Sequence, residues 1–243
     1  MLDALSAGND PLASRRGEFK KAYLSKADNT LQPYQIFVPS GYDKSKPFPL
    51  VIALHGMGGD ENSYLSFYGQ GAFKTEAERR GYIVACPKGR KPASMYVGDA
   101  EKDVMDVLAE VRRAYNIDAD RIYLTGHSMG GFGTWSVAMN HPEVFAALAP
   151  IAGGANNPAN MSKIAHIPQI VVHGDKDATV PVERSRVMVE MGKKLGAEIK
   201  YIEVPGGDHA SIVVPNFPAV FDWFDTHKRK SAAAAAASGS SKN

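Results

Sequence analysis

Short apolar runs alternate with amphipathic segments along most of the chain. The run 50–54 (Leu-Val-Ile-Ala-Leu) is apolar at every position, which is typical of a strand buried on both faces. This pattern predicts strands over 17–24, 31–38, 50–54, 82–86, 122–125, 144–151, 167–172 and 198–204. It predicts helices over 63–80, with a break near 69–71, and over 99–115, 128–139, 182–195 and 215–228.

The order of these elements predicts the fold class. The first two strands alternate and are joined by a turn at 26–29, so we expect an antiparallel pair. From residue 50 onward strands alternate with helices, which predicts an α/β fold with a mostly parallel central sheet and helices on both faces.

The chain ends differ in composition from the middle. Residues 1–16 are small and polar, which predicts a flexible N-terminal segment, and 229–243 form an Ala-rich low-complexity tail. The remaining 17–228 are enough for one large domain with its own core. We therefore expect a single catalytic or binding domain between two tails.

Composition excludes several classes of function. The net charge is +2, but Lys228, Arg229, Lys230 and Lys242 lie at the C-terminal end, so the body is nearly neutral and no nucleic acid partner is expected. No run of 18 apolar residues predicts an integral membrane segment. The N-terminal residues lack the pattern of a signal peptide, and both a cytoplasmic and a secreted protein remain open, as does the oligomeric state. The single cysteine, Cys86, falls in an apolar run and is expected to be a buried small side chain.

Motifs for metals and nucleotides are missing from the sequence. The chain has no H-E-x-x-H pair and neither of the common glycine-rich phosphate loops, so we expect no metal and no cofactor.

Residues 126–130 (Gly-His-Ser-Met-Gly) join a predicted strand to a predicted helix. This spacing fits G-x-S-x-G, in which a serine on a strained turn stands clear of the sheet edge and the glycines allow close packing. The N–H groups at the start of the helix would face a negative charge forming next to Ser128. Ser128 is therefore the candidate nucleophile.

A serine nucleophile needs a base, and the base needs a carboxylate partner. His209 is the best base among the seven histidines, because it alone follows the last strand in a glycine-rich loop. His127 adjoins Ser128 but is expected to point elsewhere. Asp177 is the favoured acid, and Asp175 and Asp208 compete with it. The order Ser, Asp, His along the chain is one of three familiar orders for such a triad.

Five stretches together resemble single-domain serine esterases of the α/β-hydrolase superfamily. They are Val38–Asp43 (VPSGYD), Leu54–Glu61 (LHGMGGDE), Thr125–Trp135 (TGHSMGGFGTW), His173–Pro181 (HGDKDATVP) and Gly206–His209 (GGDH). The nearest group is that of polyhydroxybutyrate depolymerases, feruloyl and acetylxylan esterases, and prolyl-oligopeptidase-like catalytic domains.

This resemblance implies roles for individual residues. It implies that Ser128 is the nucleophile, Asp177 the acid and His209 the base, with the backbone N–H groups of Met57 and Met129 stabilising the oxyanion. His55 is expected to bond within its own loop. The connection 153–166 is short, so little or no cap domain is expected.

The substrate is less well defined by the sequence. Loop side chains that could line the substrate pocket are Tyr64, Leu65, Tyr96, Trp135, Thr179 and Val180. We expect a carboxylesterase acting on a small-molecule or carbohydrate-linked ester, with feruloyl and cinnamoyl esters among the candidates. The alternative is a serine peptidase, in which Glu61 or Glu183 would bind the peptide amine; a binding protein without catalysis is disfavoured because all three triad residues are present.

Overall fold

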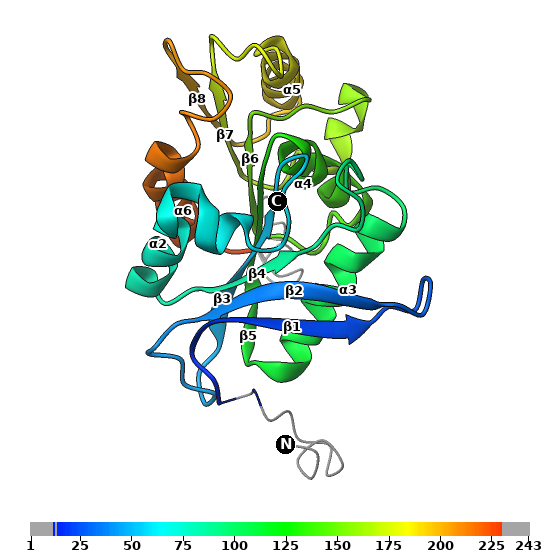
Figure 1. Cartoon of the computed structure of the whole chain (residues 1–243). Helices are drawn as coiled ribbons and strands as arrows, with labels where there is room; N and C mark the ends of the chain where they lie inside the picture. The colour runs from blue at the N-terminus through cyan, green and yellow to red at the C-terminus, as the bar shows by residue number, and fades with distance from the viewer. Residues whose placement is uncertain (1–11, 13, 230–243) are drawn as a thin grey trace, which may run out of the picture.

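One central sheet with helices packed on both faces makes up the described part of the chain (Figure 1). The structure is a computed structural model that describes residues 12 and 14–229. The expected flexible segment 1–16 and tail 229–243 lie almost entirely outside the described residues. Within the described part, no helix is long and apolar enough to span a bilayer.

The sheet has eight strands in the order β1-β2-β4-β3-β5-β6-β7-β8. The strands are β1 (Gly17–Leu24), β2 (Leu31–Val38), β3 (Phe48–Leu54), β4 (Ile83–Pro87), β5 (Ile117–His127), β6 (Ala147–Ile151), β7 (Gln169–Gly174) and β8 (Ile199–Val204). β2 pairs antiparallel with both β1 and β4, and all other pairs are parallel. The expected mostly parallel sheet is therefore confirmed, including the antiparallel pair at its start.

Two apolar layers sandwich the sheet. Helices α2 (Ala72–Arg80) and α6 (Phe217–Thr226) cover one face, and α3 (Asp99–Ala114), α4 (Met129–Asn140) and α5 (Glu183–Lys194) cover the other (Figure 1). Along β3, side chains alternate between the layers: Leu50, Ile52 and Leu54 join the layer of α3, α4 and α5, whereas Val51 and Ala53 join the opposite one. Burial on both faces explains why this strand is apolar at every position.

The helical stretch expected over 63–80 is broken, as the glycines near 69–71 suggested. It consists of a π-helical turn η1 (Ser63–Phe67), a short 3₁₀ turn η2 (Tyr68–Gln70) and α2. Gly69 and Gly71 adopt φ of 57° and 91°, which glycine reaches without strain. The break turns Tyr68 away from the axis of α2, and the π-helical turn itself was not expected from the sequence.

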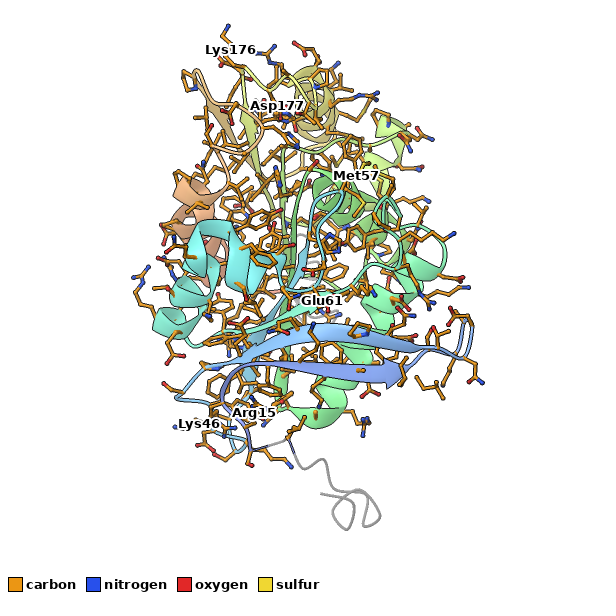
Figure 2. The ribbon with its side chains drawn as sticks, viewed as in Figure 1. Arg15, Lys46, Met57, Glu61, Lys176 and Asp177 are labelled. Carbon is orange, nitrogen blue, oxygen red and sulfur yellow. The ribbon has the colours of Figure 1, made fainter. Side chains whose placement is uncertain are left out.

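The remaining elements bring several loops to one edge of the sheet. Short 3₁₀ turns, η3 (Pro158–Lys163) and η4 (Val214–Asn216), complete the chain between the larger elements. Because β3, β5, β7 and β8 are parallel, the loops that follow them lie at the same edge, where open α/β sheets bind ligands. In Figure 2, Met57 and Asp177 lie in the upper half of the view, and Lys46 and Arg15 lie at the opposite end.

Candidate active site

The turn between β5 and α4 holds Ser128 in a strained conformation. Its φ of 58° and ψ of −118° fall in a region that residues with a side chain rarely occupy. The Ser128 N–H donates to the carbonyl of Ile151 at 2.9 Å, and its carbonyl accepts from the N–H of Phe132 at 3.0 Å. These bonds fix the turn from both sides, so the strained turn expected at this serine is present.

Two glycines let this turn sit against the sheet. A Cβ on Gly130 would lie 1.9 Å from the carbonyl oxygen of Leu54, and one on Gly126 would lie 2.2 Å from that of Gly130. No side chain fits at either position. The start of α4 therefore abuts the end of β3 directly, and the loop after β3 passes beside Ser128.

Asp177 and His209 form a hydrogen-bonded pair. His209 Nδ1 lies 2.7 Å from Asp177 Oδ2, and the other carboxylate oxygen accepts the N–H groups of Thr179 and Val180 at 2.8 Å each. Burial alone would raise the pKa of Asp177, but the hydrogen bonds from His209 and from these N–H groups outweigh it and hold the pKa below its usual range. The carboxylate is thus ionised at neutral pH, and the imidazole of His209 is only partly buried.

The two competing carboxylates brace loops. Asp175 Oδ1 accepts the N–H of Gly206 at 2.7 Å, and Asp208 Oδ1 accepts the N–H groups of Ala210 and Ser211 at 3.0 and 2.8 Å. The two bonds of Asp208 are of the kind by which aspartate stabilises its own turn, whereas the bond of Asp175 joins two loops. Neither carboxylate takes the place of Asp177 beside His209.

The loop after β3 and the first turn of α4 each carry one of the two expected oxyanion donors. A Cβ on Gly56 would lie 3.5 Å from Ser128 Cβ, so the backbone that leads to Met57 runs beside the nucleophile candidate. The side chain of Met57 is exposed, whereas that of Met129 is buried. The N–H of Met129 belongs to the first turn of α4, where helix N–H groups have no partner within the helix. Both N–H groups therefore belong to backbone that borders Ser128.

His55 anchors this loop. Its Nδ1 lies 2.8 Å from the carbonyl oxygen of Gly56, and its Nε2 lies 2.7 Å from that of Lys88, which follows β4. The ring is buried and bonds within its own loop, as expected, but it also ties the loop to the neighbouring strand.

Two further histidines lie closer to the site than the sequence suggested. His127, expected to point elsewhere, places Nε2 2.8 Å from the carbonyl oxygen of His209, and the two rings are 4.7 Å apart between centroids. His173 is fully buried, and its Nε2 lies 3.3 Å from Asp177 Oδ2. The expectation for His127 is therefore wrong. The only sequence signal was that each of these histidines ends a buried strand.

Four of the six expected pocket residues are part of the core instead. Tyr64 and Leu65 pack in the layer of α2 and α6, and Tyr96 and Trp135 pack in the opposite layer. A Cβ on Gly133 would lie 2.7 Å from the ring of Tyr96, so this glycine makes room for that ring under α4. The core needs these large side chains, so the expectation that they line a pocket is corrected. Thr179 and Val180 lie on the loop of Asp177 and donate their N–H groups to its carboxylate.

A cavity of about 210 Å³ runs along α4. Phe132, Ser136 and Asn140 line it at four-residue spacing, so they share one face of that helix, beginning one turn from Ser128. Its wall is mostly amide and thioether or aromatic: Met95, Val97, Phe132, Ser136, Met139, Asn140, Gly154, Ala155, Asn156, Asn157 and Asn160. None of the six residues that the sequence suggested for substrate binding lines this cavity, although Met95 and Val97, which flank Tyr96 in the sequence, do.

Comparison with known proteins agrees with the fold and the motifs. A family model described as PET hydrolase-like matches residues 101–220. A bifunctional acetylxylan esterase/xylanase of Neocallimastix patriciarum is 32% identical over 146 residues, covering 58% of this chain and 21% of that protein. A probable feruloyl esterase C of Aspergillus terreus is 27% identical over 190 residues, covering 75% of this chain and 65% of that protein. The chain thus spans less than two thirds of each of these relatives.

A solved structure described as a thermostable esterase superposes with a TM-score of 0.78 at 28% sequence identity. The superposition covers 87% of this chain and 63% of that one. The sheet order, the strained serine turn and this superposition show that the chain has the α/β-hydrolase fold, and over much of its length it is similar to esterases.

Proposed function

We propose that the protein is a serine carboxylesterase in which Ser128 is the nucleophile, His209 the base and Asp177 the acid. The observation that carries this proposal is the Asp177–His209 hydrogen bond of 2.7 Å at the sheet edge that also presents the strained Ser128 turn. With Nδ1 bonded to an ionised carboxylate, His209 keeps Nε2 free to accept a proton.

The reaction follows from these positions. Ser128 Oγ attacks the ester carbonyl carbon while His209 takes the hydroxyl proton, and the N–H groups of Met57 and Met129 bind the tetrahedral oxyanion. His209 then gives the proton to the departing alkoxide, which leaves as alcohol and generates acyl-Ser128. A water molecule, deprotonated by His209, attacks the acyl group, and the acid leaves as Ser128 recovers its proton.

Two ion pairs favour an ester over a peptide substrate. A peptidase needs a free carboxylate for the substrate amine, and Glu61 and Glu183 were the candidates. Glu61 is buried and pairs with Lys20 at 2.6 Å, and Glu183 pairs with Arg186 at 2.9 Å. An amine would have to displace these partners, whereas an ester needs no such carboxylate.

The cavity along α4 supports a carbohydrate-linked alcohol. Amide side chains can both donate to and accept from sugar hydroxyls, and Asn156 and Asn160 stand beside the apolar surface of Phe132 and Met95. An ester with its carbonyl at Ser128 could extend its alcohol part along this wall. Feruloyl, cinnamoyl or other carbohydrate-linked esters are the substrates that we propose.

The deciding test is a substrate panel on wild type, Ser128→Ala and a control, Ser162→Ala, whose side chain is exposed on η3. The panel contains p-nitrophenyl acetate, butyrate and octanoate, methyl ferulate, a feruloylated oligosaccharide and an aminoacyl p-nitroanilide. We expect ester turnover in wild type and the control, and a loss of at least about a thousandfold in Ser128→Ala. Anilide turnover with weak ester turnover would instead establish the peptidase, and full activity in Ser128→Ala would overturn the proposal.

A further inference from the structure

His127 uses both ring nitrogens in hydrogen bonds that join separate parts of the site. Its Nε2 lies 2.8 Å from the carbonyl oxygen of His209, and its Nδ1 lies 3.1 Å from the hydroxyl of Tyr68. A carbonyl oxygen can only accept, so Nε2 carries the hydrogen. Nδ1 of the neutral ring then has a lone pair, and the Tyr68 hydroxyl donates to it.

The network continues as a contact with the loop after β3. The backbone of Gly56 lies against the Tyr68 hydroxyl, and a Cβ on Gly56 would lie 3.5 Å from His127 Nδ1. The Tyr68 and His127 rings meet edge to face, 5.7 Å apart between centroids. Tyr68 is brought here by the break between the π-helical turn η1 and α2.

Burial keeps the imidazole of His127 neutral, which this pattern of hydrogen bonds requires. His127 is 7% exposed, and burial, followed by the charge of His209, lowers its pKa to about 4. At neutral pH the ring therefore offers one donor and one acceptor, which are the two functions that its neighbours require. A fully satisfied polar network in such surroundings holds its members in one arrangement.

We propose that His127 is a positioning residue that, through Tyr68 and the carbonyl of His209, holds the base loop in register with the loop of the oxyanion donors. The inference rests on the function proposed above, because it concerns the same site. His127 does not touch the reacting atoms. It fixes the main chain of His209, whose side chain must stay aligned between Asp177 and Ser128.

Two substitutions separate the two bonds of the ring. The amide N–H of His127→Gln reaches about as far as Nε2 and can still donate to His209. His127→Asn reaches only as far as Nδ1, so it can meet Tyr68 but leaves the His209 carbonyl without its donor. We expect kcat to stay within about fivefold of wild type for Gln and to fall ten- to a hundredfold for Asn, with KM changed less than about threefold in both, since misplacement of about 1 Å has effects of this size.

Tyr68→Phe tests the other end of the chain. We expect a smaller loss of kcat, about three- to tenfold, because the His209 carbonyl keeps its donor. In the double variant Tyr68→Phe/His127→Asn the loss should not exceed that of His127→Asn by more than about twofold, because the connection is already broken. His141→Asn is the control: this histidine bonds Glu101 at 3.0 Å, away from the site, and activity should not change.

The closing experiment measures the rate at which a fluorophosphonate labels Ser128, since this reaction needs an activated serine but no ester pocket. Wild type and His127→Gln should label at similar rates, and His127→Asn at least tenfold more slowly, at a temperature where all are folded by circular dichroism. No labelling of wild type would overturn the proposed function. The positioning role alone would be overturned if wild type is labelled and both variants are labelled at equal rates. It would also be overturned if both variants lose the same labelling rate in proportion to their loss of melting temperature.

Discussion

The imidazole of His173 lies against the side of Asp177 that faces the protein interior. Its Nε2 is 2.9 Å from the carbonyl oxygen of Val180 and 3.3 Å from Asp177 Oδ2, and its Nδ1 is 2.7 Å from the hydroxyl of Ser185. Burial lowers the pKa of His173, so the ring is neutral, with its hydrogen on Nε2; the Ser185 hydroxyl lies within hydrogen-bond distance of both Nδ1 and the carbonyl oxygen of Gly153. The same oxygen, Asp177 Oδ2, thus lies near a ring nitrogen of both His209 and the buried neutral His173.

Removing the charge of Asp177 should abolish most activity while the fold survives. Asp177→Asn keeps the size of the side chain but no longer stabilises the imidazolium of His209 or selects its tautomer. We expect kcat to fall by about 10³–10⁴. Asp208→Asn is the matched control, because Asp208 caps its own turn, and its kcat should stay within about twofold of wild type. Equal activity of the two variants would mean that Asp177 is not the acid.

The low pKa of His127 predicts a loss of stability in mild acid. The folded-state pKa of about 4 lies below the unfolded value of about 6.5, so the unfolded state binds more protons between them and stability falls as pH drops through this window. Between pH 7 and 4.5 this group alone should remove about 2 kcal/mol from the free energy of unfolding. The depressed pKa of Asp177 changes the free energy of unfolding mainly below the usual pKa of an aspartate, so it contributes little between pH 7 and 4.5.

Urea unfolding of wild type and His127→Gln at both pH values checks this. The Gln variant lacks the titrating ring and should lose less stability on acidification. An identical pH dependence in the two proteins would show that His127 is not the group responsible.

Gly130 should tolerate no side chain. A Cβ there would lie 1.9 Å from the Leu54 carbonyl oxygen, so Gly130→Ala must push α4 away from β3. We expect a loss of about 3 kcal/mol or more of stability, or insoluble protein. Gly41→Ala is the control, since nothing lies within 4 Å of its Cβ and its φ is not positive, and its melting temperature should be unchanged or slightly higher.

A buried ion pair away from the site should matter for stability and not for catalysis. Asp103 is 2% exposed, pairs with Arg90 and accepts the hydroxyl of Tyr23 at 2.6 Å. Asp103→Asn removes the buried charge and leaves the guanidinium only the more exposed carboxylate of Asp28, so we expect a loss of about 2 kcal/mol with kcat unchanged. The exposed pair of Asp99 and Lys102 is the control, and Asp99→Asn should cost less than about 0.5 kcal/mol.

The cavity along α4 should distinguish large from small alcohols. Asn160→Leu removes an amide from its wall and should raise KM for a feruloylated oligosaccharide about tenfold, with KM for methyl ferulate unchanged. Asn62→Leu is the comparison variant, because the amide of Asn62 donates to Asp60 at 2.9 Å and does not line this cavity. An equal change in KM for both esters would place the alcohol elsewhere.

The sequence predicted those features that depend on local pattern. Strand β3 could be recognised because burial on both faces requires apolar residues throughout, and the strained turn at Ser128 because only glycines fit at Gly126 and Gly130. Strand β5 was expected to start at 122 and starts at Ile117, because Ile117 already pairs with Phe48 of β3; an irregularity follows, and residues 117–121 are only partly buried.

The orientation of individual side chains could not be predicted from local sequence pattern. Tyr96 and Trp135 stand beside glycine-rich loops in the sequence, yet packing turns both into the core. The same applies to His127, whose contacts are to residues 59 and 82 positions away in the chain. No local pattern encodes such contacts, and only the assembled sheet brings their partners together.

Strand β8 has a neighbour on one side only, and it carries the loop of His209. Edge strands open more readily than interior ones because fewer backbone hydrogen bonds hold them. The site therefore combines a serine that follows an interior strand with a base that follows an edge strand of the sheet. On warming, such an enzyme would lose activity when β8 and the His209 loop open, while the rest of the sheet is still folded. Resistance to heat inactivation would then be gained by stabilising β8 and this loop, not by improving the core.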